Sequence, residues 1–272
     1  MRIFAIKNDD DITEKRIYGY LFYYENEDKY HIEIPRDVEY WEAPMIIDHF
    51  VEDGSYCIGE HYSKKWVHSR IIPPDRQCLG MILRDNKLDR YDEFRLLTLS
   101  TGRCAQDSFY ITGIKYADLP DEIKERMKRG ISDVSFIAEG RAWFVMKDGT
   151  IFEVECADRG NPKLDMLNRA LSYYNLLTDV IISPDGTGII IGGNFEFTRE
   201  EVLRYGKALN VSRDILRSIM SDKLVGSEEA AAILGCSRQN IDDLVKRGRL
   251  SPVKSGANGN IFLKCDVLDR KK

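Results

Sequence analysis

Three consecutive residues near the C-terminal end of the chain, Arg238, Gln239 and Asn240, are of the types that read base pairs in DNA. Arginine can form paired hydrogen bonds with guanine, and asparagine or glutamine can form them with adenine. Ser237 precedes this group, and Asp243 follows it with a carboxylate that can accept a hydrogen bond from cytosine. These residue types predict the recognition of bases in the major groove.

Further basic and polar residues follow and are candidate contacts to the phosphate backbone. Lysine and arginine neutralise phosphates, and polar groups add hydrogen bonds to phosphate oxygens. Contacts of this kind position a protein on DNA without reading its sequence. The candidates are Lys246, Arg247, Arg249, Lys254, Ser255, Asn258 and Lys264.

Two helices between Ser227 and Gly248 are predicted to present the base-reading residues. Ser227 can cap the first helix, and Gly235 can take the left-handed conformation with which a chain leaves a helix. Ser237 can cap the second helix, and Gly248 ends it. The segment therefore predicts a helix, a tight turn and a second helix.

The apolar residues of the second helix predict its orientation. Ile241, Leu244 and Val245 form a stripe that is expected to pack against Ile233 and Leu234 of the first helix. Because this stripe faces inward, the residues from 238 to 240 and Asp243 remain near the exposed N-terminal face. That end of the second helix enters the major groove in helix-turn-helix proteins.

A basic hairpin is predicted after the second helix. The segments 249–255 and 260–264 flank Gly256-Ala257-Asn258-Gly259, in which the Asn-Gly pair tolerates positive φ and can close a two-stranded wing. The wing would carry Lys254 and Lys264, and Asp266-Val267-Leu268 can open one further short helix.

This arrangement resembles the winged helix-turn-helix of the excisionase and MerR-like group. The resemblance covers about fifty residues and implies a DNA-binding domain whose second helix reads the major groove. The matching residues are Glu229-Ala230-Ala231, Leu234-Gly235, Ser237-Arg238, Lys246-Arg247-Gly248-Arg249-Leu250 and Asp266.

Two features depart from that group. The module is C-terminal and no heptad repeat follows it. The resemblance therefore does not imply that this protein senses ligands as MerR-like regulators do. Asp242 and Asp243 place two carboxylates on the second helix, where they oppose phosphate unless Asp243 meets cytosine or both face solvent. A helical pair that makes only protein contacts is the alternative interpretation.

A second group of residues, between positions 61 and 103, has the composition of a phosphate site. Seven positions separate its two histidines, which places both on one helical face, and guanidinium groups match the geometry of phosphate. The alternative is a solvated basic helix with partly buried histidines. The group consists of His61, Lys64, Lys65, His68, Arg70, Arg76, Arg95 and Arg103.

The sequence lacks the known signatures of several enzyme classes. It contains no phosphate-binding P-loop, no Gly-x-Ser-x-Gly nucleophile elbow and no His-Glu-x-x-His zinc helix. Its six cysteines are scattered without a Cys-x-x-Cys pair, so neither a zinc site nor a disulfide framework is expected. We predict a protein that is not an enzyme and that needs no cofactor or metal.

The segments before residue 119 predict sheet followed by helices. Two β-rich segments within 16–35 surround the polar turn 25–28 and predict a hairpin. Between Trp41 and Ser100, apolar residues recur three and four positions apart, which predicts several short helices. Pro73-Pro74-Asp75 has the composition of a helix start.

The middle segment predicts a small α+β unit. Its elements are a helix over 121–129, strands over 134–137, 142–146 and 151–156, a helix over 163–177, strands over 179–183 and 188–191, and a helix capped by Thr198 and Glu201. Through Lys147-Asp148-Gly149 and Phe197 to Leu203, the unit resembles a small bacterial domain of unknown function that is often encoded beside predicted toxin and antitoxin genes. The resemblance implies a scaffold or partner-binding role.

The whole chain is predicted to be α+β. Its expected parts are an N-terminal hairpin-plus-helices domain over 1–118, a small α+β domain over 119–210, a connecting helix and linker over 211–226, and the winged helix-turn-helix over 227–272. In the connecting part, the residues from Ser212 to Ser221 predict a helix whose apolar side is expected to pack against another apolar surface.

The distribution of charge favours localised DNA binding. The 272 residues carry 40 basic and 45 acidic side chains, a net charge of −5, which argues against coating of nucleic acid by bulk charge. Residues 221–272 hold ten Lys or Arg and seven Asp or Glu, a net of +3, whereas residues 1–220 hold 30 and 38, a net of −8. Neither a secretory signal nor a membrane-spanning segment is evident, so we expect a cytoplasmic protein.

Two functions follow from these patterns. The first is a bacterial or phage transcriptional regulator that binds double-stranded DNA, as a homodimer because one small module makes few phosphate contacts. The second is an antitoxin-like or mobile-element accessory protein that holds a protein partner through residues 1–210 and DNA through its C-terminus.

Overall fold

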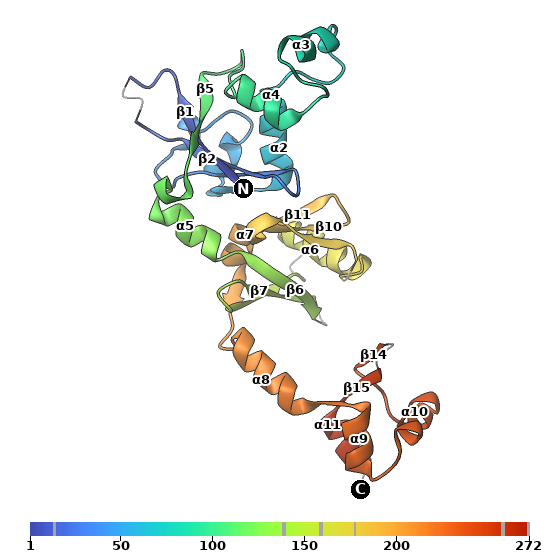
Figure 1. Ribbon diagram of the computed structural model, residues 1–272. Helices are drawn as coiled ribbons and strands as arrows, with labels where there is room; N and C mark the ends of the chain where they lie inside the picture. Colours follow the sequence, from blue (N-terminus) through green and yellow to red (C-terminus); the bar gives the residue numbers. More distant parts are fainter. Residues whose placement is uncertain (13–14, 138–139, 158–159, 177, 257–258, 271–272) are drawn as a thin grey trace. The chain divides into compact units, whose positions relative to one another are not determined.

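The structure is a computed structural model that describes residues 1–12, 15–137, 140–157, 160–176, 178–256 and 259–270 (Figure 1). Contacts divide the chain into Met1–Leu209, called unit 1 here, and Asn210–Lys272, called unit 2. Both units combine helices with antiparallel sheets, which confirms the predicted α+β class. Residues 1–118 and 119–209 fall within one unit, and their division into two domains stays a prediction.

The first half of unit 1 is built on a five-stranded antiparallel sheet in the order β4-β3-β2-β1-β5. Strand β2 (Gly19–Tyr24) is buried along its whole length because both faces of the sheet are covered. Leu21 belongs to a core with Trp66, whereas the adjacent Phe22 belongs to a separate core with Ile123. The other strands are β1 (Arg2–Asn8), β3 (Lys29–Glu33), β4 (Cys57–Ile58) and β5 (Phe109–Ile114). The predicted hairpin is confirmed as β2 and β3.

Several short helices accompany this sheet, as predicted. They are α1 (Asp48–Glu52), α2 (Glu60–His68), α3 (Leu79–Asp85) and α4 (Glu93–Leu99), with a 3-10 turn over Tyr40–Glu42. The helix start predicted at Pro73 and Pro74 is wrong. The Arg76 amide donates to the Pro73 carbonyl in a single turn. Cys78 then has the left-handed conformation, with φ 65°, so this turn does not continue into α3.

The second half of unit 1 contains two smaller antiparallel sheets around one core. Phe144 and Ile189 come from the two sheets, Leu167 and Val202 come from the helices over Pro162–Tyr173 and Arg199–Tyr205, and all four are fully buried in this core. One sheet has the order β12-β8-β7-β6 and the other β11-β10-β9. The elements are α5 (Asp121–Lys128), β6 (Ile131–Ile137), β7 (Arg141–Met146), β8 (Ile151–Glu155), α6 (Pro162–Tyr173), β9 (Val180–Ile182), β10 (Gly188–Ile191), β11 (Phe195–Thr198), α7 (Arg199–Tyr205) and β12 (Gly206–Ala208), with 3-10 turns over Tyr116–Asp118 and Pro184–Gly186.

Most local predictions for this region are confirmed. Gly149 has φ 88° in the tight turn between β7 and β8, and Thr198 caps α7 reciprocally with Glu201. Helix α6 ends at Tyr173, four residues before the predicted end at 177. Glycine is required at position 130, shortly after α5, because the backbone at Asp185 packs against it. A Cβ atom at this position would lie 2.0 Å from the Asp185 carbonyl oxygen.

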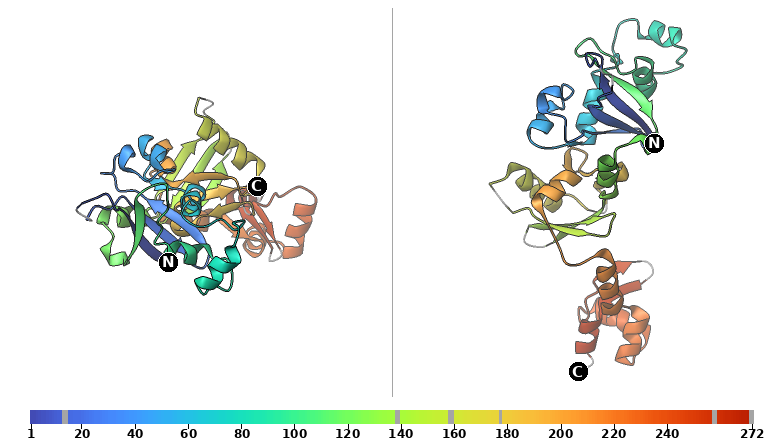
Figure 2. Two further views of the ribbon diagram at one scale, coloured as in Figure 1. Left: turned by 90° about the horizontal axis from the view of Figure 1, so that it is seen from above. Right: turned by 90° about the vertical axis from the view of Figure 1, so that its left-hand side faces the viewer.

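Unit 2 contains four helices and a small antiparallel sheet in the order β13-β15-β14 within its described residues (Figure 2). Its core is made by Val225, Ala230, Ile241, Phe262 and Val267, with Ala231 and Leu250. The elements are α8 (Arg213–Lys223), β13 (Leu224–Gly226), α9 (Ser227–Leu234), α10 (Arg238–Lys246), β14 (Lys254–Gly256), β15 (Gly259–Leu263) and α11 (Lys264–Asp269).

The predicted connecting segment 211–226 holds two elements. The expected helix is present as α8, which Ser212 caps by accepting a hydrogen bond from the Ile215 amide. The segment then forms β13, which pairs with β15 and so extends the predicted two-stranded wing to three strands. No helix in the described part of the chain is long and apolar enough to span a lipid bilayer.

Candidate nucleic-acid interface

The turn between α9 and α10 has the predicted geometry. Gly235 has φ 65° at the end of α9, and the Cys236 amide donates to the Ala231 carbonyl in the same turn. Ser237 caps α10 because its Oγ accepts a hydrogen bond from the Asn240 amide at 3.3 Å. The chain therefore leaves one helix and enters the next within three residues, from Gly235 to Ser237.

The core of unit 2 determines which face of α10 is exposed. Ile241 is fully buried, and Leu244 and Val245 pack against the same core, as the apolar pattern predicts. The side chains of the N-cap and the first turn, which precede Ile241, are exposed to solvent. They are Ser237, Arg238, Gln239 and Asn240.

Ser227 has a different role from the predicted one. Glu229 caps α9 by accepting a hydrogen bond from the Gly226 amide at 2.8 Å, and Ser227 is the first residue of the helix. The buried Ser227 hydroxyl instead accepts from the Asn260 amide and donates to the Asn260 carbonyl, both at 3.3 Å. Ser227 thus joins α9 to the central strand of the wing.

The wing hairpin pairs Lys254 with Ile261 and Gly256 with Gly259. Lys254 and Ser255 are exposed on its edge strand β14. Positions 257 and 258 lie between the paired glycines, and Asn258, a predicted DNA contact, lies outside the described residues. Lys264 is exposed, but it is the first residue of α11 and not part of the wing, because β15 ends at Leu263.

Arg238 brings the start of α10 close to the wing. A Cβ atom added at Gly259 would lie 3.3 Å from Arg238 Nη2. On its other side, Arg238 Nη1 lies 3.5 Å from a carboxylate oxygen of Glu228, and both side chains are more than half exposed. The predicted base-reading group and the predicted backbone-contacting hairpin therefore lie next to each other.

The remaining predicted contacts lie further along α10. Asp243 is partly buried, as is its neighbour Asp242, so neither carboxylate faces solvent completely. Lys246 and Arg247 are exposed at the last turn of α10, roughly 12 Å along the helix axis from Arg238. Arg249 is exposed just beyond. These three cations are therefore separated from the predicted base-reading group and stay predicted phosphate contacts.

The predicted histidine group in unit 1 does not form one site. His61, Lys64, Lys65 and His68 line a surface pocket of about 310 Å³, together with residues that include Glu60 and Glu196. Arg70, Arg76 and Arg103 line a different pocket, and Arg95 belongs to neither. Arg70 is almost fully buried and forms paired hydrogen bonds with Asp107 at 2.9 and 2.6 Å, so its charge is already matched.

A buried charge cluster in unit 1 was not predicted from the sequence. Glu33 is fully buried at the end of β3, and Arg199 of α7 forms an ion pair with it. Arg126 of α5 adds a second ion pair at 3.2 Å, and His31 Nε2 lies 2.6 Å from the same carboxylate. Burial raises the pKa of Glu33, but the charge of Arg199 and the contact with His31 outweigh it and lower the pKa to about 2.

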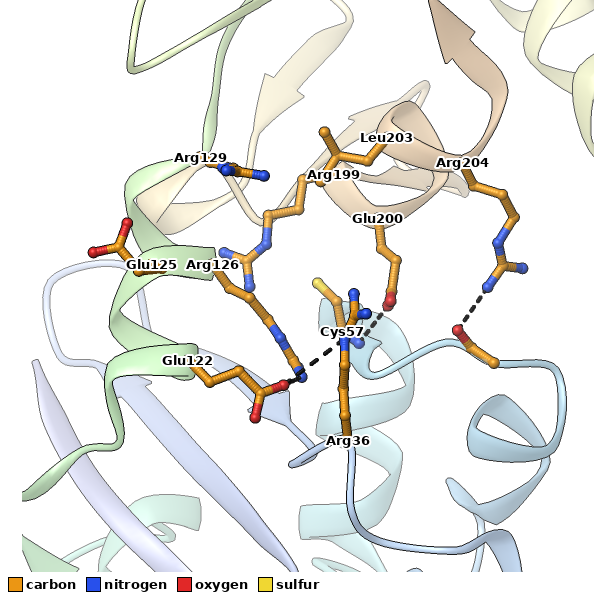
Figure 3. Close-up of a pocket in the computed structure, with 11 residues that line it drawn as sticks. Arg36, Cys57, Glu122, Glu125, Arg126, Arg129, Arg199, Glu200, Leu203 and Arg204 are labelled. Carbon is orange, nitrogen blue, oxygen red and sulfur yellow. Dashed lines mark hydrogen bonds and ion pairs between the residues drawn. The ribbon is translucent and has the colours of Figure 1, made fainter.

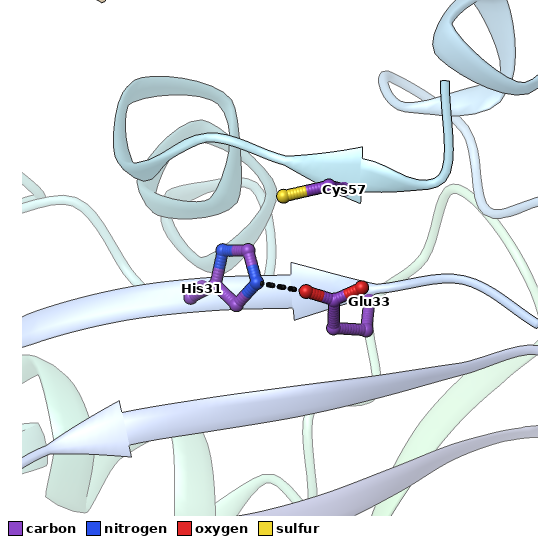
Figure 4. Close-up of side chains that lie close together, drawn as sticks. All are labelled: His31, Glu33 and Cys57. Atoms are coloured by element: carbon purple, nitrogen blue, oxygen red, sulfur yellow. Dashed lines mark hydrogen bonds and ion pairs between the residues drawn. The ribbon is translucent and has the colours of Figure 1, made fainter. Parts of the chain in front are cut away.

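Three residues of this cluster have the types of metal ligands. The ligand atoms of His31, Glu33 and Cys57 lie within 4.8 Å of one another, and all three residues are buried (Figure 4). Two guanidinium groups already occupy the Glu33 carboxylate and repel a cation. Burial raises the pKa of the Cys57 thiol well above its usual value, which disfavours the thiolate that binds metals. The trio therefore fits a structural charge cluster better than a metal centre.

The sequence contains one signal for this cluster. In the β-rich run from Tyr30 to Ile34, Glu33 is the only acidic residue, and His31 lies two positions before it, on the same face of the strand. Nothing in the sequence near Arg199 indicates burial, because the Thr198 capping box places it in an ordinary first helical turn.

Comparisons of the chain with protein-family models, with curated proteins and with solved structures find no match.

Proposed function

We propose that unit 2 binds double-stranded DNA, with the first turn of α10 in the major groove and the wing on the phosphate backbone. The observation that supports this proposal is the exposed run Arg238, Gln239 and Asn240 beside the basic edge of the wing. Lys246, Arg247 and Arg249 extend the cationic surface toward the other end of α10. Their side chains would contact phosphates on either side of the groove.

The proposed biological role is a transcriptional regulator that acts in the cytoplasm as a homodimer. One module of this size makes few phosphate contacts, so two copies on two half-sites are needed for useful affinity and specificity. Helix α8 offers an apolar stripe for pairing, because Ile215, Ile219 and Met220 are each about half exposed and none of its eleven residues is buried.

The test is a salt titration of binding to genomic DNA fragments with single variants. We expect Arg238→Ala to relax sequence preference, because it removes a bidentate contact to a base. We expect Lys254→Ala to weaken binding to all sequences alike and to flatten the salt dependence by about one unit, because it removes one phosphate contact. Lys207→Ala, at an exposed lysine of unit 1, is the matched control and leaves both properties unchanged.

If neither unit 2 variant alters binding, α10 is not the recognition helix. If the native protein selects no sequence from a genomic library, the regulator proposal fails as a whole.

A second candidate function is partner binding through unit 1, as in an antitoxin-like or mobile-element accessory protein. Trp41 is 69% exposed, the ring of Tyr40 contacts it, and Tyr40 and Met45, four positions further on, are about half exposed. Aromatic and methionine side chains are enriched at protein interfaces, and a cluster of them on a surface marks a contact site. A stable complex that co-purifies with the native protein, and is lost in Trp41→Ala, would favour this function.

A further inference from the structure

A pocket of about 440 Å³ in unit 1 lies beside the buried charge cluster, between α5 and α7 (Figure 3). Five arginines and three glutamates line it, which is an unusual concentration of guanidinium groups around one cavity. The charged lining residues are Arg36, Glu122, Glu125, Arg126, Arg129, Arg199, Glu200 and Arg204.

Each glutamate of the pocket already has hydrogen-bond donors. Glu200 accepts from the backbone amides of Tyr56 and Cys57 at 2.6 and 2.8 Å. Glu122 pairs with Arg126 of the same helix, and Glu125 accepts from Lys128 at 2.5 Å. The carboxylates of the lining therefore already have hydrogen-bond partners within the protein.

Several of the arginines keep donor capacity. The side chain of Arg129, the residue that follows α5, makes no hydrogen bond or ion pair with any described residue and is exposed. Arg204 donates to the Gly54 carbonyl and the Ser55 hydroxyl, which leaves its charge without a carboxylate partner in the described chain. Arg199 is only 2% exposed, and its Nη1 has no hydrogen-bond partner among the described groups.

We propose that this pocket binds a small organic molecule that carries a phosphate group. Guanidinium groups form paired hydrogen bonds with phosphate oxygens, and donors from α5 and α7 converge on the pocket from two sides. Its volume lies in the range of pockets for small organic ligands and is larger than a bare phosphate ion requires. Leu203 and the backbone at Gly54 provide less polar lining for the rest of the molecule.

The charges that line the pocket support a role in ligand binding over a purely structural role. A structural ion-pair network uses its charges internally, as Glu33 does with Arg126 and Arg199. The lining keeps an excess of positive charge at Arg129 and Arg204, whose side chains pair with no carboxylate of the described chain, and Arg129 is the clearest unused donor. An anion would neutralise this excess and would link α5 to α7.

The experiment is calorimetric titration of the full-length protein with AMP, pyrophosphate and citrate at low ionic strength. AMP tests a phosphate ester, pyrophosphate tests phosphate without an organic part, and citrate tests carboxylates of similar charge. We expect AMP to bind one site per chain, and binding of pyrophosphate without binding of AMP would contradict a ligand with an organic part. Arg129→Ala should weaken AMP binding about tenfold, because it removes charge-assisted hydrogen bonds.

Two further variants complete the design. Arg129→Lys keeps the charge without the planar fork, so it should recover only part of the affinity. Arg90→Ala removes an exposed arginine of unit 1 outside the pocket and should bind as the native protein does.

Three further results would overturn the proposal. Binding that is equally strong in Arg129→Ala would place the ligand elsewhere, for example on unit 2. The absence of binding by both phosphate compounds at millimolar concentration would exclude a phosphate site. Arg129-dependent binding of citrate alone would assign the pocket to carboxylates.

Discussion

At the scale of single residues, Glu33 is a tightly constrained buried charge. Its carboxylate is fully buried and is held by two arginines and a histidine. A glutamate in an unfolded chain titrates near 4.5, and the folded environment lowers the pKa of Glu33 to about 2. The folded state thus favours the ionised form of Glu33. The stabilisation of the fold by this carboxylate is fully present above pH 4.5 and is lost as the pH falls toward 2.

We predict that Glu33→Gln destabilises the protein by about 3 to 5 kcal/mol at neutral pH, because it leaves two arginines facing an uncharged amide. The variant should also lose less stability than the native protein between pH 4.5 and pH 2. Denaturant unfolding at several pH values measures both effects. Glu25→Gln, in an exposed pair with Arg2, is the control and should change little.

An acid-unfolding curve of Glu33→Gln that parallels the native curve would show that Glu33 is not the titrating group.

At the scale of elements, α10 depends on local capping as well as on its apolar stripe. Ser237→Ala removes the hydrogen bond to the Asn240 amide and should cost about 1 kcal/mol. We expect faster hydrogen exchange at the backbone amides of the first turn and weaker DNA binding. Ser218→Ala, at an exposed position within α8, is the control and should leave α10 unchanged.

Unchanged exchange in the first turn of α10 after Ser237→Ala would mean that packing of Ile241 alone holds the helix.

Most elements with local signals were predicted, the helix start at Pro73 being an exception, and several elements that depend on distant partners were not. The hairpin of β2 and β3, the turn at Gly235 and the cap at Ser237 each depend on residues within a few positions. Strands β1 and β5 pair across about a hundred residues, and β13 forms because β15 lies beside it. The sequence pattern carries no information on such pairings.

The same distinction applies to the sites. Spacing and residue type suffice to propose the DNA-contacting residues of α10, because one helix presents them. The pocket of unit 1 combines residues from α5, α7 and the loops beside β3 and β4, so its arginines come together only in the folded unit. The ion pair of Glu33 and Arg199 spans 166 positions.

At the scale of the whole molecule, the two units have separate cores. Phe262 lies in the core of unit 2, and Trp66 lies in a core of unit 1. We predict two calorimetric unfolding transitions. Phe262→Ala should lower one midpoint and Trp66→Ala the other, since each removes about 3 to 5 kcal/mol of packing from its own unit.

A single transition that both substitutions shift equally would show that the units unfold together. An exposed substitution in each unit, Arg90→Ala and Ser218→Ala, provides the baseline for both transitions.

The ion pair between β3 and α7 also constrains the order in which the chain can fold during synthesis. Glu33 leaves the ribosome 166 residues before Arg199, a delay of roughly 10 to 30 s at ordinary elongation rates. Arg126 emerges 93 residues after Glu33 and can bind the carboxylate first. The buried carboxylate of the nascent N-terminal sheet therefore gains its two arginine partners one after the other. The sheet reaches its final form only after α7 has been translated.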